Sequence, residues 1–181
     1  MLGSLVGSVG LAAALLLGGA AVGKLRAPQP AATMLRRALP GGLRFLARPA
    51  AVRGAGLGEL AVAAAAVLTG SRWALALLAA AYLGFLALSV RLAATRSSAS
   101  CGCFGRADGP VGADHVALNL VATAAAVIGV VRPPGAGGGW FDRAALPAVV
   151  GVAQAGLLAV LAYLAITALP ALGAERRRAA P

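Results

Sequence analysis

Long apolar runs separated by short polar segments form the main pattern along this chain. Five runs stand out, at residues 2–22, 54–70, 73–90, 116–131 and 144–169. Each approaches the ~20 apolar residues that a helix needs to cross the hydrocarbon core of a bilayer. Asp114 could cap the fourth run, and Pro147 falls in the first turn of the fifth, where proline is tolerated. The pattern predicts an all-α fold, a polytopic transmembrane helix bundle of four core helices plus a fifth, C-terminal helix.

The same pattern divides the chain into four parts. We expect a four-helix membrane domain at residues 1–131 and a flexible loop at 132–143. An additional transmembrane helix follows at 144–170, and then a basic tail at 171–181, expected to be a disordered anchor at the membrane surface. The first run opens with MLGSLVGSVG, without the positive charge that usually begins a cleaved signal peptide, so we interpret it as a retained helix.

Composition supports a membrane protein and argues against a nucleic-acid-binding one. The chain is 60% hydrophobic, its mean hydropathy is +0.88, and only 12% of its residues are charged, against about 25% in soluble domains. The net charge is +11, but aromatic residues make up only 4% of the chain and no basic cluster is interleaved with them. We therefore expect membrane lipids, and no nucleic acid, among its partners.

The positive charges alternate between the loops. Counting Lys and Arg, the loops after the first, third and fifth runs carry 13, and the loops after the second and fourth carry 3. Cytoplasmic loops carry the excess of Lys and Arg in membrane proteins. This count predicts a multi-pass protein of the cell membrane with its amino terminus outside, and with its carboxyl terminus and the loop of residues 91–115 in the cytoplasm.

The loop after the first run contains an amphipathic stretch, TMLRRALPGGLRFLARP. Four apolar residues fall on one helical face beside two arginines: Met34, Leu35, Ala38 and Leu39, with Arg36 and Arg37. This arrangement fits a short helix lying at an anionic leaflet, and a solvated basic loop is the alternative.

Small residues recur at four-residue spacing within the runs. The pairs include Gly19 with Gly23, Gly54 with Gly58, and Gly151 with Ala155. Such spacing allows helix backbones to approach closely in lipid, so together the pairs favour a tightly packed bundle.

Both cysteines lie in the loop before the fourth run, separated only by Gly102. A Cys-X-Cys pair can close a disulfide, supply two ligands to a metal, or remain two inert small residues. Zinc normally takes four ligands, and combining Cys101 and Cys103 with His115 and Asp108 or Asp114 would be an unusual set. We therefore expect neither a metal nor another cofactor.

The redox interpretation of the pair has a better physical basis. Joining Cys101 to Cys103 closes a very small ring, which departs from relaxed disulfide geometry, and strained disulfides exchange readily. Gly102 gives the backbone freedom to bend, and the flanking Arg96 and Arg106 favour the thiolate, which is the attacking species. We therefore favour the hypothesis that the two cysteines are catalytic or relay thiols, and the alternative is that they are inert.

Glu59 is the only acidic residue inside an apolar run, and an intramembrane carboxylate is a functional-site hypothesis by default. Lys24, at the end of the first run, is its expected ionic partner. The pair would either fix how two helices dock or move protons coupled to the thiol chemistry.

His115 and Asn119 are four residues apart, so they share a helix face just after the cysteine loop. Histidine ordinarily titrates near neutral pH, so His115 could act as the base for a thiol, and the alternative is a solvated residue. We expect Asn119 to hydrogen-bond across helices.

The segment CGCFG in the loop before a late helix resembles the methylamine-utilisation protein MauE family, within the DoxX-like membrane protein group. Other matching features are VGKLRAP at the end of the first run, GELAVAAAAVLTG in the second, and Asn119 in the fourth. The resemblance covers about residues 5–131 and is specific mainly through CGCFG. Members often carry an arginine directly before the asparagine, and this chain has Leu118 there, so any role of that arginine is not carried over.

The resemblance implies thiol–disulfide exchange in the maturation of a redox protein through Cys101 and Cys103. The expected partner is a thioredoxin-like thiol carrier or an exported redox protein client, and the chain itself would be a possible thiol–disulfide oxidoreductase. Two alternatives remain: a non-catalytic membrane subunit with incidental cysteines, and a DoxX-like quinone-linked oxidoreductase component.

The predicted orientation conflicts with the usual place of this chemistry. Disulfides of exported proteins form outside the cytoplasmic membrane, whereas the charge count places the cysteine loop inside. Either the pair exchanges with a cytosolic carrier and passes reducing equivalents across the membrane, or the orientation is reversed. The charge count favours the first.

Overall fold

A computed structural model describes residues 2–95, 104, 111–133 and 145–179, with side chains for 7–95, 104, 111–133 and 149–168. These residues form helices and no strands. The elements are α1 (Leu2–Arg26), α2 (Gln29–Ala38), the 3-10 helix η1 (Gly41–Ala47), α3 (Pro49–Thr69), α4 (Arg72–Ala94), α5 (Ala113–Val131) and α6 (Ala145–Ala179). Five of them, α1 and α3 to α6, are long and apolar enough to cross a membrane. The predicted all-α transmembrane bundle is confirmed.

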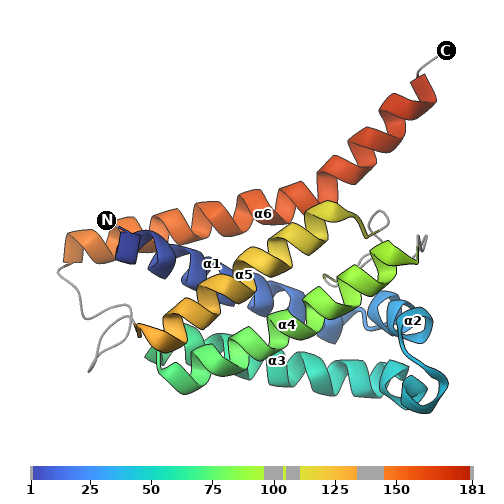
Figure 1. The fold of residues 1–181 in the computed structure, drawn as a ribbon, viewed down its shortest axis with the longest axis horizontal. Helices are drawn as coiled ribbons and strands as arrows, with labels where there is room; N and C mark the ends of the chain where they lie inside the picture. Colours follow the sequence, from blue (N-terminus) through green and yellow to red (C-terminus); the bar gives the residue numbers. More distant parts are fainter. Residues whose placement is uncertain (1, 96–103, 105–110, 134–144, 180–181) are drawn as a thin grey trace.

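Helix α1 is the central element of the bundle. In its span 61% of the residues are buried, against 11–28% in the other four. It packs against α3, α5 and α6, while α4 packs mainly against α5 (Figure 1). The apolar run at the amino terminus therefore forms the structural core, and the other four spans expose a larger share of their residues.

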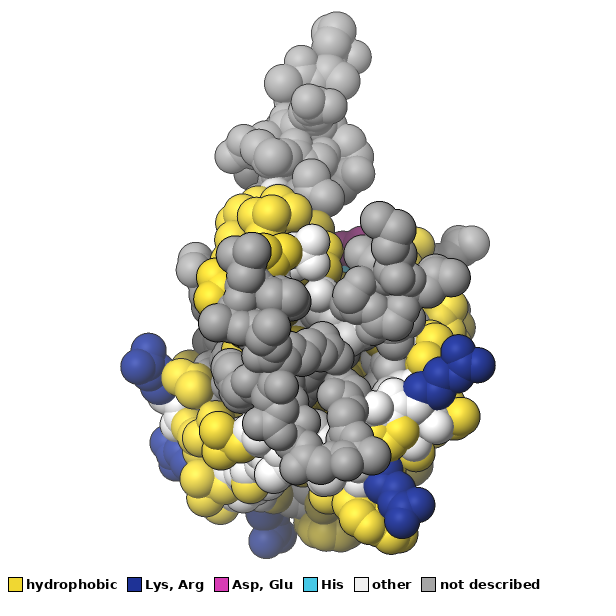
Figure 2. Space-filling view, turned by 90° about the vertical axis from the view of Figure 1, so that its left-hand side faces the viewer, with side chains coloured by type: hydrophobic (Ala, Val, Ile, Leu, Met, Phe, Trp, Pro, Cys, Tyr) yellow, Lys and Arg dark blue, Asp and Glu magenta, His cyan; other side chains and the backbone are white. Residues whose placement is uncertain are grey.

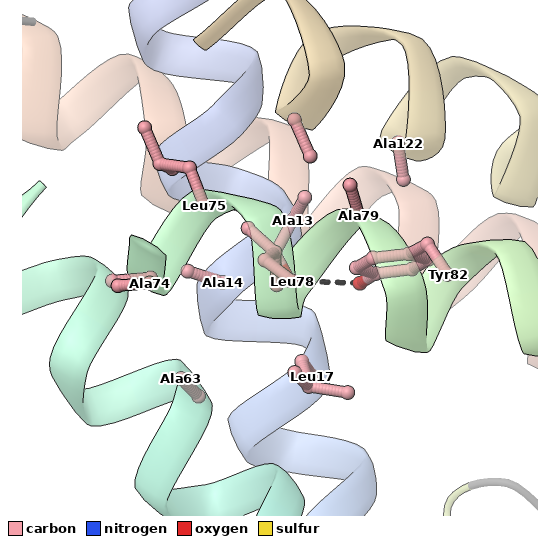
Figure 3. Packing of buried hydrophobic residues seen from close by; sticks show 12 residues of the cluster. Ala13, Ala14, Leu17, Ala63, Ala74, Leu75, Leu78, Ala79, Tyr82 and Ala122 are labelled. Atoms are coloured by element: carbon pink, nitrogen blue, oxygen red, sulfur yellow. Dashed lines mark hydrogen bonds between the residues drawn. The ribbon is translucent and has the colours of Figure 1, made fainter. Parts of the chain in front are cut away.

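Small side chains dominate the core, as Figure 3 shows. Ala13, Ala14 and Leu17 of α1 meet Leu78 and Tyr82 of α4. The buried Tyr82 hydroxyl donates a hydrogen bond of 2.7 Å to the carbonyl oxygen of Ala13, which satisfies its polar group inside the bundle. Small residues allow the close approach on which dispersion contacts between helices depend in lipid.

The closest approach of α1 and α3 uses other small residues than the spacing predicted. A Cβ on Gly56 would lie 3.2 Å from the carbonyl oxygen of Ala21, so the α1 backbone passes directly over this glycine. Gly54 and Gly58, by contrast, have nothing within 4 Å of the position of a Cβ, and neither does Gly151. The repeated four-residue spacing therefore indicated a tightly packed bundle, but not every residue of these pairs lies at a contact between helices.

The flanks of the bundle are apolar. Figure 2 views the bundle from the end that lies on the left in Figure 1, and yellow hydrophobic side chains lie along both sides and the bottom of its outline, with Lys and Arg side chains among them. Leu77, Leu120 and Leu157, from three different spans, are each more than half exposed. Exposed large apolar side chains on five long helices are what a bilayer covers.

Residues close in sequence determine where the helices end, and one of these ends departs from the sequence prediction. Gly70 ends α3 in the left-handed region (φ 56°), and the Ser71 hydroxyl caps α4 by accepting from the amide of Ala74. Helix α5 has Gly112 at its N-cap with no side-chain cap, so the predicted capping role of Asp114 is wrong. Asp114 lies instead in the first turn, where a negatively charged carboxylate interacts favourably with the helix dipole.

Helix α6 is longer than its apolar run. Pro147 lies in its first turn as predicted, but the helix continues to Ala179 through the segment expected to be a disordered tail. It bends in its last part, toward the carboxyl terminus (Figure 1). Pro170 lies inside this helix, and a proline there removes a backbone hydrogen bond, which is a usual cause of a kink.

The amphipathic stretch after α1 forms the helix α2. Its buried residues Met34 and Ala38 pack with Leu92 of α4 and Val111, while its two arginines are exposed. The predicted short helix is therefore present, but the bundle, rather than a lipid leaflet, covers its apolar face. Because α2 contacts Leu92 near the end of α4 and Val111 just before α5, these three segments lie at the same end of the bundle (Figure 1).

Candidate functional site

The cysteine loop meets the bundle at Phe104. Cys101, Gly102 and Cys103 lie outside the described residues, and so do Asp108 and the two flanking arginines of the loop. Phe104, which directly follows Cys103 in the chain, is described and packs into the bundle. The surroundings of Phe104 therefore define the candidate site.

Gly23 of α1 forms the seat on which the Phe104 backbone rests. A Cβ on Gly23 would lie 2.8 Å from Phe104 Cα and closer still to its carbonyl carbon and oxygen, a separation that real Cβ atoms do not adopt. One turn earlier, a Cβ on Gly19 would lie 3.7 Å from the Phe104 ring, an ordinary contact. The backbone of Phe104 thus needs glycine at position 23 and tolerates a methyl group at position 19.

The Phe104 ring is held from the other side by Tyr163 of α6. The two ring centroids are 5.1 Å apart and the ring planes meet at 85°, an edge-to-face contact. The cysteine loop is therefore joined to the bundle between its first and its last helix.

A small cavity of about 40 Å³ lies beneath the Phe104 ring. His115 and Asn119 of α5 line it together with Tyr82 and Phe85 of α4. Its volume is sufficient for a water molecule. Leu118 also lines it, so part of its wall is apolar.

His115 is buried, with 4% of its surface exposed. Its Nδ1 lies 3.2 Å from Oδ1 of Asp114, but the geometry is not that of a hydrogen bond, and Nδ1 has no hydrogen-bond partner among the described residues. A buried polar atom without a partner is uncommon and is typical of functional sites. The imidazole therefore has an uncommitted nitrogen close to the residue that follows Cys103.

Asn119, one turn further along α5, is buried and paired. Its side-chain amide donates a hydrogen bond of 3.0 Å to the hydroxyl of Ser89 in α4. The predicted hydrogen bond across helices is thus present. It fixes α5 against α4 and so holds His115 at the cavity.

The predicted ion pair of Lys24 with Glu59 is also present. Lys24 Nζ donates to both carboxylate oxygens at 2.6 Å, and the two side chains are only 7% and 14% exposed. Nζ also lies 4.6 Å from the centroid of the Phe85 ring, a cation–π contact. Phe85 lines the cavity beside Phe104, so it connects the ion pair to the site.

The structure thus gathers at one end of the bundle all the predicted site residues that it describes. His115 and Asn119 line the cavity, and Lys24 contacts the ring of Phe85, which also lines it. Sequence reasoning did not single out Phe104 or Tyr163. The phenylalanine of CGCFG was the available signal for the first, and no local signal pointed to the second.

The described residues offer no metal site. None of them form a group of three or more His, Cys, Asp or Glu side chains that could hold an ion. The two cysteines lie outside this comparison, because their positions are not described.

The comparisons with known proteins identify a family. Residues 2–132 match the protein family described as methylamine utilisation protein MauE, a match that covers α1 to α5 and includes both cysteines and the Phe104 seat. No curated protein matches the chain, and no solved structure does. With five apolar helices and a family match over most of its length, the chain is a multi-pass membrane protein that belongs to the methylamine utilisation protein MauE family.

Proposed function

We propose that the protein carries out thiol–disulfide exchange through Cys101 and Cys103 in support of the maturation of a redox protein. The observation that carries the proposal is the seating of Phe104 above a cavity lined by His115. The peptide bond from Phe104 keeps the Cα of Cys103 about 3.8 Å from that of Phe104. One of the two thiols is therefore tethered to a fixed point of the bundle.

The exchange is a transfer of two electrons between two dithiol–disulfide pairs. One thiolate of the pair attacks a sulfur of the partner's disulfide, forms a mixed disulfide and releases the partner's first thiolate. The second thiolate then attacks its neighbour's sulfur, which closes the Cys101–Cys103 disulfide and releases the partner fully reduced. The same steps in reverse oxidise the partner.

His115 is the proposed base in this reaction. A thiol must lose its proton to become the nucleophile, and a base within reach accelerates that step. The unpartnered Nδ1 of His115 can accept the proton without breaking a hydrogen bond to a described residue. The partner is a thioredoxin-like thiol carrier or an exported redox protein client.

The side of the membrane follows from the charge count. The end of the bundle with α2, η1 and the cysteine loop carries the excess of Lys and Arg, which favours the cytoplasm. In that orientation the pair exchanges with a cytosolic thiol carrier.

Cysteine variants test the proposal. We expect Cys101→Ser and Cys103→Ser each to abolish exchange with a thioredoxin-like carrier, and one of them to trap a mixed disulfide that reducing agent releases. His115→Gln should slow exchange at neutral pH, whereas the control Val121→Ala, at an exposed position of the same helix, should change it little. If the double cysteine variant supports maturation of the client as well as the wild type, the chain is a non-catalytic membrane subunit and the proposal is wrong.

Labelling with a membrane-impermeant thiol reagent tests the orientation. Cysteines that react only after lysis of the cells support the cytoplasmic loop. Cysteines that react in intact cells place the loop outside and favour direct oxidation of exported clients.

A further inference from the structure

A second, larger hollow lies on the flank of the bundle between α1 and α6. It is an open groove of about 420 Å³, within the range of small-molecule sites. Its walls are apolar, with Leu15, Gly19 and Val22 on α1 and Ala159 and Val160 on α6. Both helices are candidate membrane spans, so the groove lies at the depth of the bilayer.

The rim of the groove is open to lipid. Leu15 is 41% exposed and Val160 is 55% exposed, so the apolar side chains on both lips face outward. Gly19 has no side chain, so the groove reaches the α1 backbone there, beside the Phe104 ring. The groove therefore admits an apolar chain from the surrounding bilayer.

The length of the groove matches one leaflet. At about 1.5 Å of rise per residue, α1 advances roughly 16 Å between Leu15 and Arg26, which both line the groove. Half of the ~30 Å hydrocarbon core is about 15 Å. A lipid tail that begins at the membrane surface would fill the groove from end to end.

The aqueous end of the groove carries a positive charge. Arg26 lines it and is exposed, and it has no ion-pair partner among the described residues. Lys24 is close in sequence but is already neutralised by Glu59. A guanidinium binds a phosphate with two parallel hydrogen bonds, so Arg26 suits the headgroup of an anionic lipid.

We propose that this groove binds one anionic phospholipid, with an acyl chain between α1 and α6 and the phosphate at Arg26. The bound lipid would extend the wall formed by Tyr163 and complete the packing around Phe104, since both residues line the groove. This inference goes beyond the proposed function: the groove shares Gly23, Phe104 and Tyr163 with the candidate site, but none of the residues that line it supplies a proton or a sulfur to the exchange.

Native mass spectrometry of the full chain, released from nanodiscs, tests the proposal. The probes are phosphatidylglycerol and phosphatidylcholine with identical acyl chains. We expect wild type to retain one phosphatidylglycerol in preference to phosphatidylcholine. Arg26→Gln should lower that preference about fivefold, the effect of one basic residue near an anionic membrane surface. The control Arg37→Gln removes an exposed arginine of α2 that does not line the groove, and should retain the preference.

A second pair of variants tests the apolar wall. Ala159→Phe should fill the groove and release the lipid, whereas Ala153→Phe, on an exposed face of the same helix, should not. Equal retention of the two lipids by wild type would overturn the proposal, and so would equal effects within either pair of variants.

Photo-cross-linking to the wild-type protein provides a test that does not depend on whether Ala159→Phe folds. Phosphatidylglycerol with a photoreactive acyl chain should label wild-type peptides from α1 residues 15–27 and α6 residues 159–163. Labelling spread evenly over the lipid-facing helices would overturn the proposal. Loss of lipid binding with normal thiol exchange, or the reverse, separates this site from the proposed function.

Discussion

Replacing Gly23 by alanine is the sharpest test of the seat that holds Phe104. The new methyl group would lie 2.8 Å from Phe104 Cα, whereas ordinary contact begins at about 3.4 Å, so the backbone must move by at least about 0.6 Å. The close atoms belong to the main chain, so a change of side-chain rotamer cannot relieve the contact. Overpacking of this kind typically costs about 1–3 kcal/mol.

That cost translates into a change in how often Phe104 leaves its seat. Each 1.4 kcal/mol is a factor of ten, so the undocked population should rise about 5- to 150-fold. Hydrogen exchange reports such local opening directly. We expect faster exchange in the peptide that contains Phe104, measured on protein in nanodiscs, and faster alkylation of Cys103 in a Cys101→Ser background.

Gly19→Ala is the matched control for this experiment. It adds the same methyl group to the same helix one turn earlier, where the nearest Phe104 atom would be 3.7 Å away. Both variants gain the same helix propensity, about 1 kcal/mol, so the difference between them isolates the contact with Phe104. Equal exchange rates in the two variants would show that Gly23 does not support Phe104.

Three further perturbations address the polar contacts inside the bundle. Lys24→Met or Glu59→Gln alone should lower the thermal midpoint of the purified protein by more than the double variant does, because each single change leaves an uncompensated buried charge. A double variant at least as unstable as either single variant would refute this. Ser89→Ala should cost about 0.6 kcal/mol by removing the acceptor of the Asn119 amide, measured by denaturant unfolding in micelles; no loss of stability would mean that the bond contributes nothing. Tyr82→Phe should cost about 1 kcal/mol through the lost hydrogen bond to the α1 backbone, and an unchanged unfolding midpoint would contradict its structural role.

The membrane spans and the ion pair could be predicted from the sequence because both depend on strong, local signals. A charge within an apolar run needs an opposite charge, and Lys24 was the nearest candidate for Glu59. His115 and Asn119 share a face by helical periodicity, so their common cavity also followed from spacing.

The contacts between distant segments could not be predicted in the same way. The four-residue spacing of Gly54 and Gly58 is identical to that of true contact pairs, and only the rotation of α3 decides that Gly56 faces α1 instead. The Phe104 contact with Tyr163 joins segments about 60 residues apart that carry no shared pattern. Helix α2 shows the same limit. An amphipathic sequence predicts an apolar helix face, but it does not tell whether protein or lipid covers that face.

Helix α6 lies beyond the family match and yet contributes to the candidate site. The match ends at residue 132, and Tyr163 and Ile166 come from the helix that follows. A chain with only the matched helices would leave one face of Phe104 uncovered. The fifth span therefore adds a wall to a site whose other parts belong to the family's shared region.

The fifth crossing has a consequence for where the ends of the chain lie. An odd number of crossings by the five candidate spans would place the two termini in opposite compartments, and the end after α6 in the compartment of the segment between α4 and α5. A reporter enzyme fused after residue 181 would therefore sample the same redox environment as Cys101 and Cys103, whereas one fused before residue 1 would sample the other. A pair of such fusions reads out the compartment of the thiols without modifying either of them.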